Sequence, residues 1–211
     1  EPLTQLYKQV RDLPNIKKAF VGSGVRYDLI VPFLDKPAYQ QYLDELLSYH
    51  VSGRLKVAPE HTSKRVLKSM RKPDFRMFHT LKRKFEEHNK KYGLKQQLIP
   101  YFISSHPGCS KTDMAELAVE TKKMHFHLEQ VQDFTPTPMT LATVMYYTGL
   151  DPYTLKPIQV AKSKEEKLAQ RKFFFWYKRE EQHSIRKELS KLGRDDLVKD
   201  LLGKEKEHKK N

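Results

Sequence analysis

Short apolar runs alternate with helix-like segments over the first 134 residues, and this alternation limits the possible folds more than any other feature. Four runs resemble short buried strands, at residues 18–21, 54–58, 98–103 and 128–134. Segments with apolar residues at helical spacing separate them. Alternating strands and helices specify a parallel sheet with helical crossovers, open or closed into a barrel. We therefore expect an α/β fold whose ligands bind at the carboxyl ends of the strands.

Helix start and stop signals support this division. Asp35 is expected to cap a helix with Pro37 in its first turn, and Gly93 is expected to end a later helix. Ser110 is followed three residues later by Asp113, which is the spacing of a capping box.

The alternation stops after Thr135. Two Thr-Pro pairs open a long irregular passage, and Ser163 then begins a helix expected to reach Leu192. Its run Phe173–Tyr177 is too apolar to lie in solvent. We divide the chain into an α/β part (1–150), an irregular segment with a helical C-terminal extension (151–203) and a charged tail (204–211) expected to be disordered.

The chain is strongly basic, with 40 Lys and Arg against 26 Asp and Glu and a net charge of +14. Residues 64–95 hold twelve basic residues against three acidic ones. A basic surface attracts nucleic acids. A nucleic-acid-binding module is therefore an alternative function, but solvated lysine-rich helix faces explain the excess equally simply, and no known nucleic-acid-binding motif is present.

Cysteine and hydropathy patterns exclude several classes. Cys109 is the only cysteine, so the chain cannot form an internal disulfide, a four-cysteine zinc site or an iron–sulfur site of its own. No apolar run approaches the roughly 18 residues of a membrane helix, and no signal peptide is visible. We expect a cytoplasmic protein without membrane contact. Because the first residue is Glu1, we also expect a piece of a longer protein.

The loops after the first two predicted strands carry polar and charged side chains. Ser23 and Arg26 follow the first strand beside two glycines and could donate to hydroxyl, carboxylate or phosphate groups. Glu60 and His61 follow the second strand and could grip a polar ligand or move a proton. A tight turn and a helix cap are the plain structural alternatives.

The two later strand exits carry similar groups. His106 and Gly108 precede the helix that begins near Ser110, where free backbone N–H groups favour an anion. Asp133 and Thr135 lie in a proline-rich exit that could form a rigid binding wall. A turn and a structural corner are the alternatives for these loops.

Metal-site signals are weak. His125 and His127 would share a face on a strand, but two ligands do not make a site. Cys109 near His106 could suggest a reactive thiolate, although a buried, unreactive cysteine is the better interpretation. We expect no metal ligands in this chain.

Five segments of the chain resemble the YgiQ-type radical S-adenosylmethionine proteins. The matching segments are AFVGSGVRYD (19–28), HVSGRLKVAPEH (50–61), SSHPG (104–108), EQVQDFTPTP (129–138) and YYTG (146–149). The Phe173–Tyr177 run and Gly193–Leu197 resemble the C-terminal extension of that family. The resemblance implies a partial (β/α) barrel, of which residues 1–150 would be the later half.

The chain departs from this family at one decisive place. The family's first loop carries a Cys-x3-Cys-x2-Cys run whose thiolates hold a [4Fe–4S] cluster that binds S-adenosylmethionine, and this sequence has no such run. The resemblance therefore implies a C-terminal fragment that is inactive alone. It places Ser23 and Arg26 near the ribose or carboxylate of S-adenosylmethionine, Glu60 near the adenine, and the segments His106–Gly108 and Asp133–Thr135 at the rim.

The expected partner is the missing N-terminal half of the same protein. Without it, an exposed sheet edge is expected to cause self-association unless the extension covers it. A third possible function is a cluster-free α/β enzyme that binds a phosphorylated metabolite at the helix after Gly108.

Overall fold

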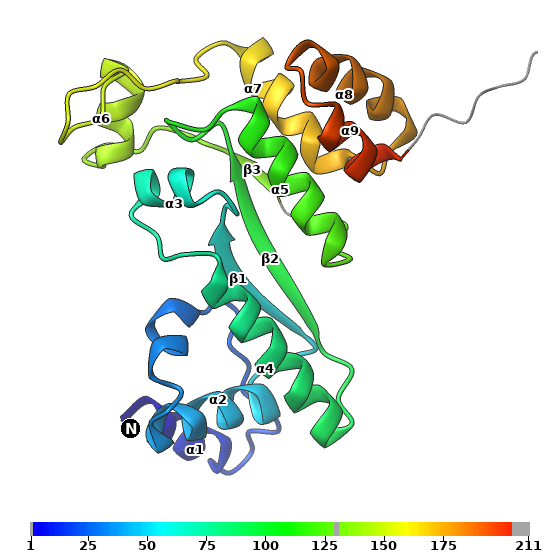
Figure 1. Cartoon of the computed structure of the whole chain (residues 1–211). Coiled ribbons are helices and arrows are strands. Elements are labelled where there is room, and N and C mark those ends of the chain that lie inside the picture. The colour runs from blue at the N-terminus through cyan, green and yellow to red at the C-terminus, as the bar shows by residue number, and fades with distance from the viewer. Residues whose placement is uncertain (1, 129–130, 204–211) are drawn as a thin grey trace, which may run out of the picture. The chain divides into compact units, whose positions relative to one another are not determined.

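The structure is a computed structural model that describes residues 2–128 and 131–203 (Figure 1). Its strands are β1 (Arg54–Glu60), β2 (Gln97–Ser104) and β3 (Val131–Asp133). The α-helices are α1 (Pro2–Arg11), α2 (Pro37–Tyr49), α3 (Lys64–Met70), α4 (Arg76–Tyr92), α5 (Lys111–Lys123), α6 (Leu141–Thr148), α7 (Lys164–Arg171), α8 (Arg179–Lys191) and α9 (Asp195–Leu202). Short 3-10 helices are η1 (Tyr27–Leu29), η2 (Val31–Phe33) and η3 (Lys172–Phe175).

The three strands form a parallel sheet in the order β1-β2-β3, which confirms the predicted α/β class. In the β2–β3 pair, Phe102 lies opposite Val131 and Ser104 opposite Asp133. Alternate residues of β1 and β2 are buried, and Pro100 lies within β2 without dividing it. Helices lead from each strand to the next along the chain, as a parallel sheet requires.

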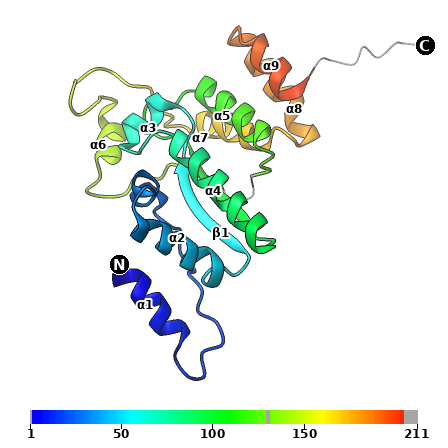
Figure 2. The ribbon, with the colours of Figure 1, turned by 60° about the horizontal axis from the view of Figure 1, so that its bottom comes forward.

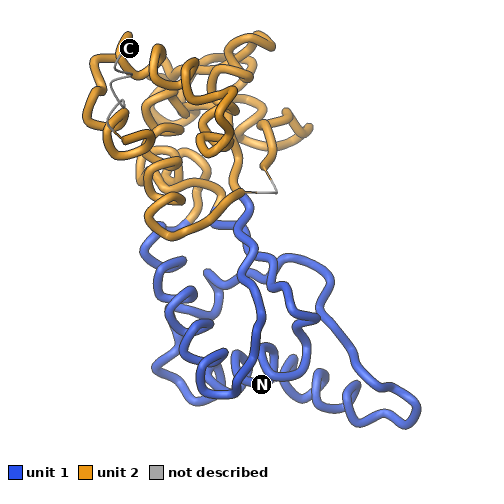
Figure 3. Tube along the Cα trace, turned by 90° about the vertical axis from the view of Figure 1, so that its right-hand side faces the viewer, with its two compact units in different colours: residues 1–59, 73–101 blue, residues 60–72, 102–211 orange. Residues whose placement is uncertain are grey.

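The chain divides into two compact units, residues 1–59 with 73–101 and residues 60–72 with 102–211 (Figure 3). The first unit holds α1, α2, α4, β1 and the beginning of β2. Helix α1 packs against α2, as Figure 2 shows. Phe78 and Leu81 of α4 and Leu46 of α2 are almost completely buried, as their helical spacing predicts.

The second unit holds the strand ends and the C-terminal helices. Helix α5 contacts α7, η3 and α9. Phe173 and Phe174 have no exposed surface, and Phe175, Trp176 and Tyr177 are partly exposed, so the aromatic run packs against the fold through its first two residues. The capping boxes at Ser110 and Ser163 are both formed, with Asp113 and Glu166 as the reciprocal partners.

One predicted strand is absent, and another is present with shorter described bounds. Residues 18–21 form no strand, because Phe20 is largely exposed and the run makes no ladder. Only Val25 makes a parallel bridge, to Val57 of β1. The last strand is limited to Val131–Asp133 among the described residues, and residues 129–130 of the predicted run lie outside them.

Predictions about helices also failed in places. The helix expected from Ser163 to Leu192 is divided into α7, η3 and α8, because the tighter η3 turn buries the adjacent Phe173 and Phe174 together. Asp35 does not cap α2, since Lys36 occupies the N-cap and Pro37 the first turn.

Two further predictions concern membrane-spanning helices and the charged tail. Among the described residues, no helix combines the length and apolarity that crossing a bilayer requires. The tail at 204–211, expected to be disordered, lies outside the described residues.

We predict that Phe174→Ala lowers the free energy of unfolding of the second unit by about 3–5 kcal/mol, because it leaves a cavity at a fully buried position. Leu168→Ala, at a position that is 51% exposed on the neighbouring helix, is the control and should change stability little. Urea unfolding followed by the fluorescence of Trp176, the only tryptophan, measures both. Equal effects of the two changes would contradict the packing described here.

Candidate functional site

Each of the three parallel strands ends in a polar residue. Glu60 ends β1, Ser104 ends β2 and Asp133 ends β3. Ser104 and Asp133 are direct partners in the β2–β3 register. Carboxyl ends of adjacent parallel strands lie at one edge of a sheet, where ligands bind in folds of this class.

A cavity of about 360 Å³ lies at this edge, within the second unit. Four residues predicted as ligand-binding contribute to its wall: Glu60, His106, Asp133 and Thr135. They come from the exits of all three strands. The volume falls within the range of roughly 300–1,000 Å³ that is usual for small-molecule sites. The structure therefore gathers four predicted residues, distant in sequence, around one small-molecule-sized space.

The cavity carries both signs of charge. The Ser104 hydroxyl donates to Oδ1 of Asp133 at 2.5 Å, and Arg171 of α7 donates to Oδ2 at 3.2 Å. These bonds hold the Asp133 carboxylate in one orientation. Across the cavity, Lys72 Nζ lies 3.2 Å from Glu60 Oε1. A polar ligand thus meets oriented carboxylates, an ammonium group and the threonine hydroxyls.

The backbone is strained at two of the strand exits. Glu60 and Ser105 both have positive φ, at 67° and 61°. Neither is glycine, and Ser105 is completely buried. Such conformations cost of the order of 1–3 kcal/mol and concentrate at functional sites. Two of the seven non-glycine residues with positive φ in the described part of the chain thus lie at the ends of β1 and β2.

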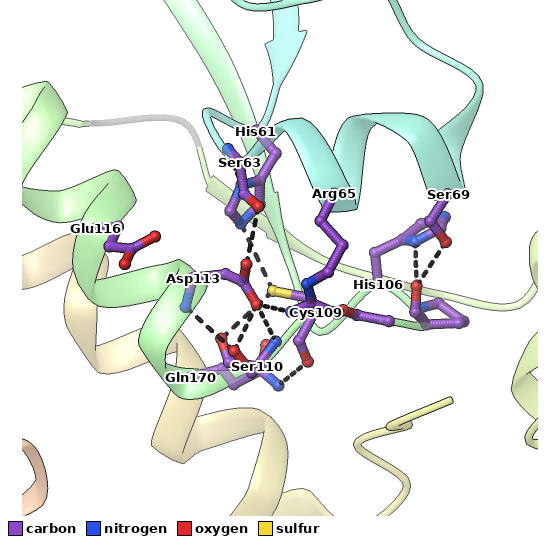
Figure 4. A network of polar contacts seen from close by, with 12 residues as sticks. His61, Ser63, Arg65, Ser69, His106, Cys109, Ser110, Asp113, Glu116 and Gln170 are labelled. Carbon is purple, nitrogen blue, oxygen red and sulfur yellow. Dashed lines mark hydrogen bonds and ion pairs between the residues drawn. The ribbon is translucent and has the colours of Figure 1, made fainter. Parts of the chain in front are cut away.

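The loop Ser105–Cys109, which carries His106, is fixed by a set of hydrogen bonds to its backbone (Figure 4). The Pro107 carbonyl accepts from Ser69 Oγ at 3.0 Å and from His106 Nδ1–H at 2.8 Å. The Gly108 carbonyl accepts from Arg65 at 2.6 Å. Gly108 has φ +88°, and an added Cβ there would lie 3.3 Å from Ser69 Oγ, so glycine suits this position.

Two residues of the C-terminal segment, Gln159 and Gln170, also hydrogen-bond to this loop. The buried Gln170 side chain of α7 accepts from the Ser105 N–H at 2.9 Å and donates to the Cys109 carbonyl at 3.0 Å. The Gly108 N–H donates to the Gln159 carbonyl at 2.8 Å. The extension therefore positions the loop that brings His106 to the cavity.

The protonation of His106 follows from these contacts. Since a carbonyl can only accept, His106 donates from Nδ1, and the neutral ring bears its lone pair on Nε2. Burial lowers the pKa of His106, although the Pro107 carbonyl opposes the shift. The ring is therefore neutral at pH 7 and can accept a hydrogen bond.

The Cys109 sulfur lies 3.5 Å from His61 Nε2 (Figure 4). The position of the proton on the His61 ring does not allow this pair to act as a nucleophile and its base. His61 Nδ1 accepts from the N–H groups of Thr62 and Ser63, so the proton of the neutral ring is on Nε2 and points to the Cys109 sulfur. The ring cannot then accept the thiol proton. Burial also raises the pKa of Cys109 well above its usual range. This pair is structural, as predicted for the cysteine.

Beneath this pair lies the buried carboxylate of Asp113. It accepts from Ser63 Oγ and from the Ser110 N–H, both at 2.8 Å, and also from Ser110 Oγ and the Arg65 guanidinium. Burial by itself raises the pKa of Asp113, but these hydrogen bonds and the Arg65 charge outweigh it and hold the pKa below its usual value. The carboxylate links α3 to the start of α5.

The other predicted residues lie elsewhere. Arg26 and Ser23 belong to the first unit, where Arg26 pairs with Asp28 at 2.7 Å and lines a separate cavity of about 320 Å³. Ser23 is exposed. Gly108 lines a third cavity, beyond the loop. The structure brings together four of the seven predicted residues.

The sequence did not predict three residues of this site. Lys72 is part of the cavity wall, and Ser104 and Arg171 hydrogen-bond to the wall residue Asp133. A serine at the end of a predicted strand was a usable signal for Ser104. Lys72 and Arg171 lie in a turn and a helix far along the chain from Asp133, so only the tertiary fold reveals them.

Comparisons with known proteins agree with a piece of a larger protein. The family described as "Domain of unknown function (DUF3362)" matches residues 129–209. A UPF0313 protein of Bacteroides thetaiotaomicron is 59% identical over 96% of this chain, one of Porphyromonas gingivalis 58% over 95%, and one of Methanosarcina acetivorans 45% over 93%. The chain spans only 33%, 32% and 26% of these relatives. This chain is thus similar to about one third of a UPF0313 protein.

We predict that lowering the pH from 7 to 4 destabilises the second unit by roughly 3 kcal/mol through His61. Burial lowers the pKa of His61 to about 4, whereas an unfolded histidine titrates near 6.5. The unfolded chain therefore binds more protons in this interval, and stability falls as the pH falls. Urea unfolding at several pH values measures the slope.

His61→Gln should flatten this slope, and His183→Gln, at an exposed position on α8, should leave it unchanged. The same slope in both variants would show that His61 does not titrate as described.

We also predict that Cys109 resists an aromatic disulfide reagent in the native protein and reacts at least a hundredfold faster in denaturant. Its side chain is 1% exposed and its thiolate is disfavoured by burial. Rapid native labelling would contradict the structural role of Cys109.

Proposed function

We propose that this chain is the C-terminal part of a radical S-adenosylmethionine enzyme, in which the cavity at the strand ends faces S-adenosylmethionine and the substrate. The observation that carries the proposal is the convergence of Glu60, His106, Asp133 and Thr135 on one cavity, since the resemblance to YgiQ-type proteins implied positions near this group for all four. The incomplete barrel is part of the same proposal.

The similarity to about one third of each UPF0313 relative supports a fragment. The first unit supports it too. Large apolar side chains in residues 1–33 are exposed, namely Leu3, Leu6, Leu13, Ile16, Phe20, Leu29 and Phe33. Exposed apolar surface of this kind is typical of an interface. The missing N-terminal half is the expected cover, and self-association of the chain without it stays a prediction.

The cavity wall suits parts of S-adenosylmethionine. Carboxylates such as Asp133 accept hydrogen bonds from ribose hydroxyls, and a neutral His106 or Thr135 can bond to adenine or ribose atoms. Glu60, which the resemblance places near the adenine, can accept a hydrogen bond from the adenine amino group, and it pairs with Lys72 in this structure. If S-adenosylmethionine bound here and received an electron from a reduced cluster held by the absent half, it would supply radical chemistry, namely hydrogen abstraction from a substrate.

The residues of this chain do not suit the iron–sulfur cluster. Three cysteine thiolates are needed, and the one cysteine is buried against His61. Within residues 2–128 and 131–203 no group of three or more His, Cys, Asp or Glu residues could hold a metal. The cluster ligands belong to the proposed N-terminal half. This chain would bind and orient S-adenosylmethionine and exclude water around it.

The test uses the complete gene product, purified without oxygen and supplied with iron and sulfide. We predict absorbance of a [4Fe–4S] cluster, saturable binding of S-adenosylmethionine, and 5′-deoxyadenosine formation with a strong reductant. Asp133→Asn should weaken S-adenosylmethionine binding about tenfold, because a charged acceptor is lost. Glu165→Gln, which removes an exposed charge on α7, is the matched control and should have no effect.

Melting temperatures of both variants show whether the fold is kept. A gene product without three clustered cysteines and without S-adenosylmethionine binding would overturn the proposal. Normal binding in folded Asp133→Asn would instead remove the site assignment. The nucleic-acid-binding alternative has no specific structural feature in its favour.

A further inference from the structure

A second cavity in the C-terminal unit, of about 780 Å³, is markedly basic. Helix α3, the loop at Gly108 and the turn at residues 151–154 contribute to it. Its wall includes Arg65, Lys68, Arg71, Gly108, Asp151 and Tyr153. We call it the basic cavity. The sequence indicates a possible anion site at the helix after Gly108, but no prediction above assigns a ligand to the α3 side of this cavity.

Helix α3 and its C-cap supply the basic residues of this wall. Arg65 and Lys68 lie one turn apart on α3, while Val66 and Leu67 are buried. Arg71 is the C-cap residue beyond the helix, with φ 57°. The helix and its C-cap therefore bring three cations to the cavity wall.

Not all of this charge is neutralised within the fold. Arg65 pairs with Asp113. The side-chain ammonium of Lys68 makes no hydrogen bond or ion pair with any described residue, although Asp151 lies within electrostatic range. Asp151 is engaged in its own turn, where Oδ1 accepts from the Tyr153 and Thr154 N–H groups at 2.9 and 2.8 Å. These bonds, with Lys68, lower the pKa of Asp151. An anion would satisfy the remaining cations.

The aromatic ring of Tyr153 lies beside one of these cations, Arg71. The Arg71 guanidinium lies 4.3 Å from the centre of the Tyr153 ring, and Tyr153 is 64% exposed. Aromatic and guanidinium planes are the surfaces on which nucleobases stack. Stacking and phosphate binding are thus available in one concave site.

We propose that the basic cavity binds a small phosphorylated ligand with a planar ring, of the nucleoside diphosphate class. Its concave shape and size suit a small molecule better than a polymer. Gly108 lies two residues from His106, so one loop contributes a residue to each of the two cavities. The basic cavity would then hold the anionic part of a substrate whose reacting part lies in the strand-end cavity. Binding itself does not depend on the radical chemistry proposed above.

The experiment titrates inorganic pyrophosphate and ADP into the complete gene product by calorimetry, without S-adenosylmethionine. We predict saturable one-to-one binding that weakens with added salt, and tighter binding of ADP than of pyrophosphate. Lys68→Gln should weaken both about tenfold. Lys64→Gln is the matched control, because it removes the same charge from the same helix outside the cavity wall.

Tyr153→Leu tests the ring contact and should abolish the preference for ADP while pyrophosphate binding persists. No binding at millimolar concentration in the folded protein would overturn the proposal. Equal losses in the two lysine variants would also overturn it, because they would indicate diffuse attraction. Tighter binding of a short RNA than of ADP would overturn the small-ligand class. Failure of radical chemistry leaves all these readouts in place.

Discussion

The arrangement of the C-terminal unit depends on one buried carboxylate. Asp113 is 6% exposed, and a charge so buried is tolerated only when its oxygens are fully hydrogen-bonded. Ser63, Arg65 and Ser110 supply those bonds and thereby join the helices that follow β1 and β2. Removing one donor would leave an uncompensated charge. Both cavities lie beside the helix and loop that this network holds.

The C-terminal extension acts on the same loop from outside the sheet. Gln170 satisfies a backbone N–H and a backbone carbonyl at the two ends of Ser105–Cys109, and Arg171, the next residue, bonds to Asp133. Consecutive residues of α7 therefore support the exits of both β2 and β3. Two residues of the region matched by DUF3362 thus support the strand ends.

The sequence predicts the features that local chemistry determines. The capping box at Ser110, the C-cap at Gly93 and the alternating burial of β1 and β2 follow from short-range patterns. Residues 18–21 do not form a strand, because a strand needs partners that no local pattern supplies. Strand ends converge by topology, so four site residues were predictable. Tertiary packing alone brings Lys72 to the cavity wall and Arg171 to Asp133.

A structure of the complete gene product with bound S-adenosylmethionine tests the central claim most directly. The account predicts density for the adenosyl group in the strand-end cavity, within hydrogen-bonding distance of Asp133 or His106, and cluster ligands outside these 211 residues. S-adenosylmethionine bound away from this cavity, or a sheet in which β1 to β3 have no further parallel neighbours, would contradict it.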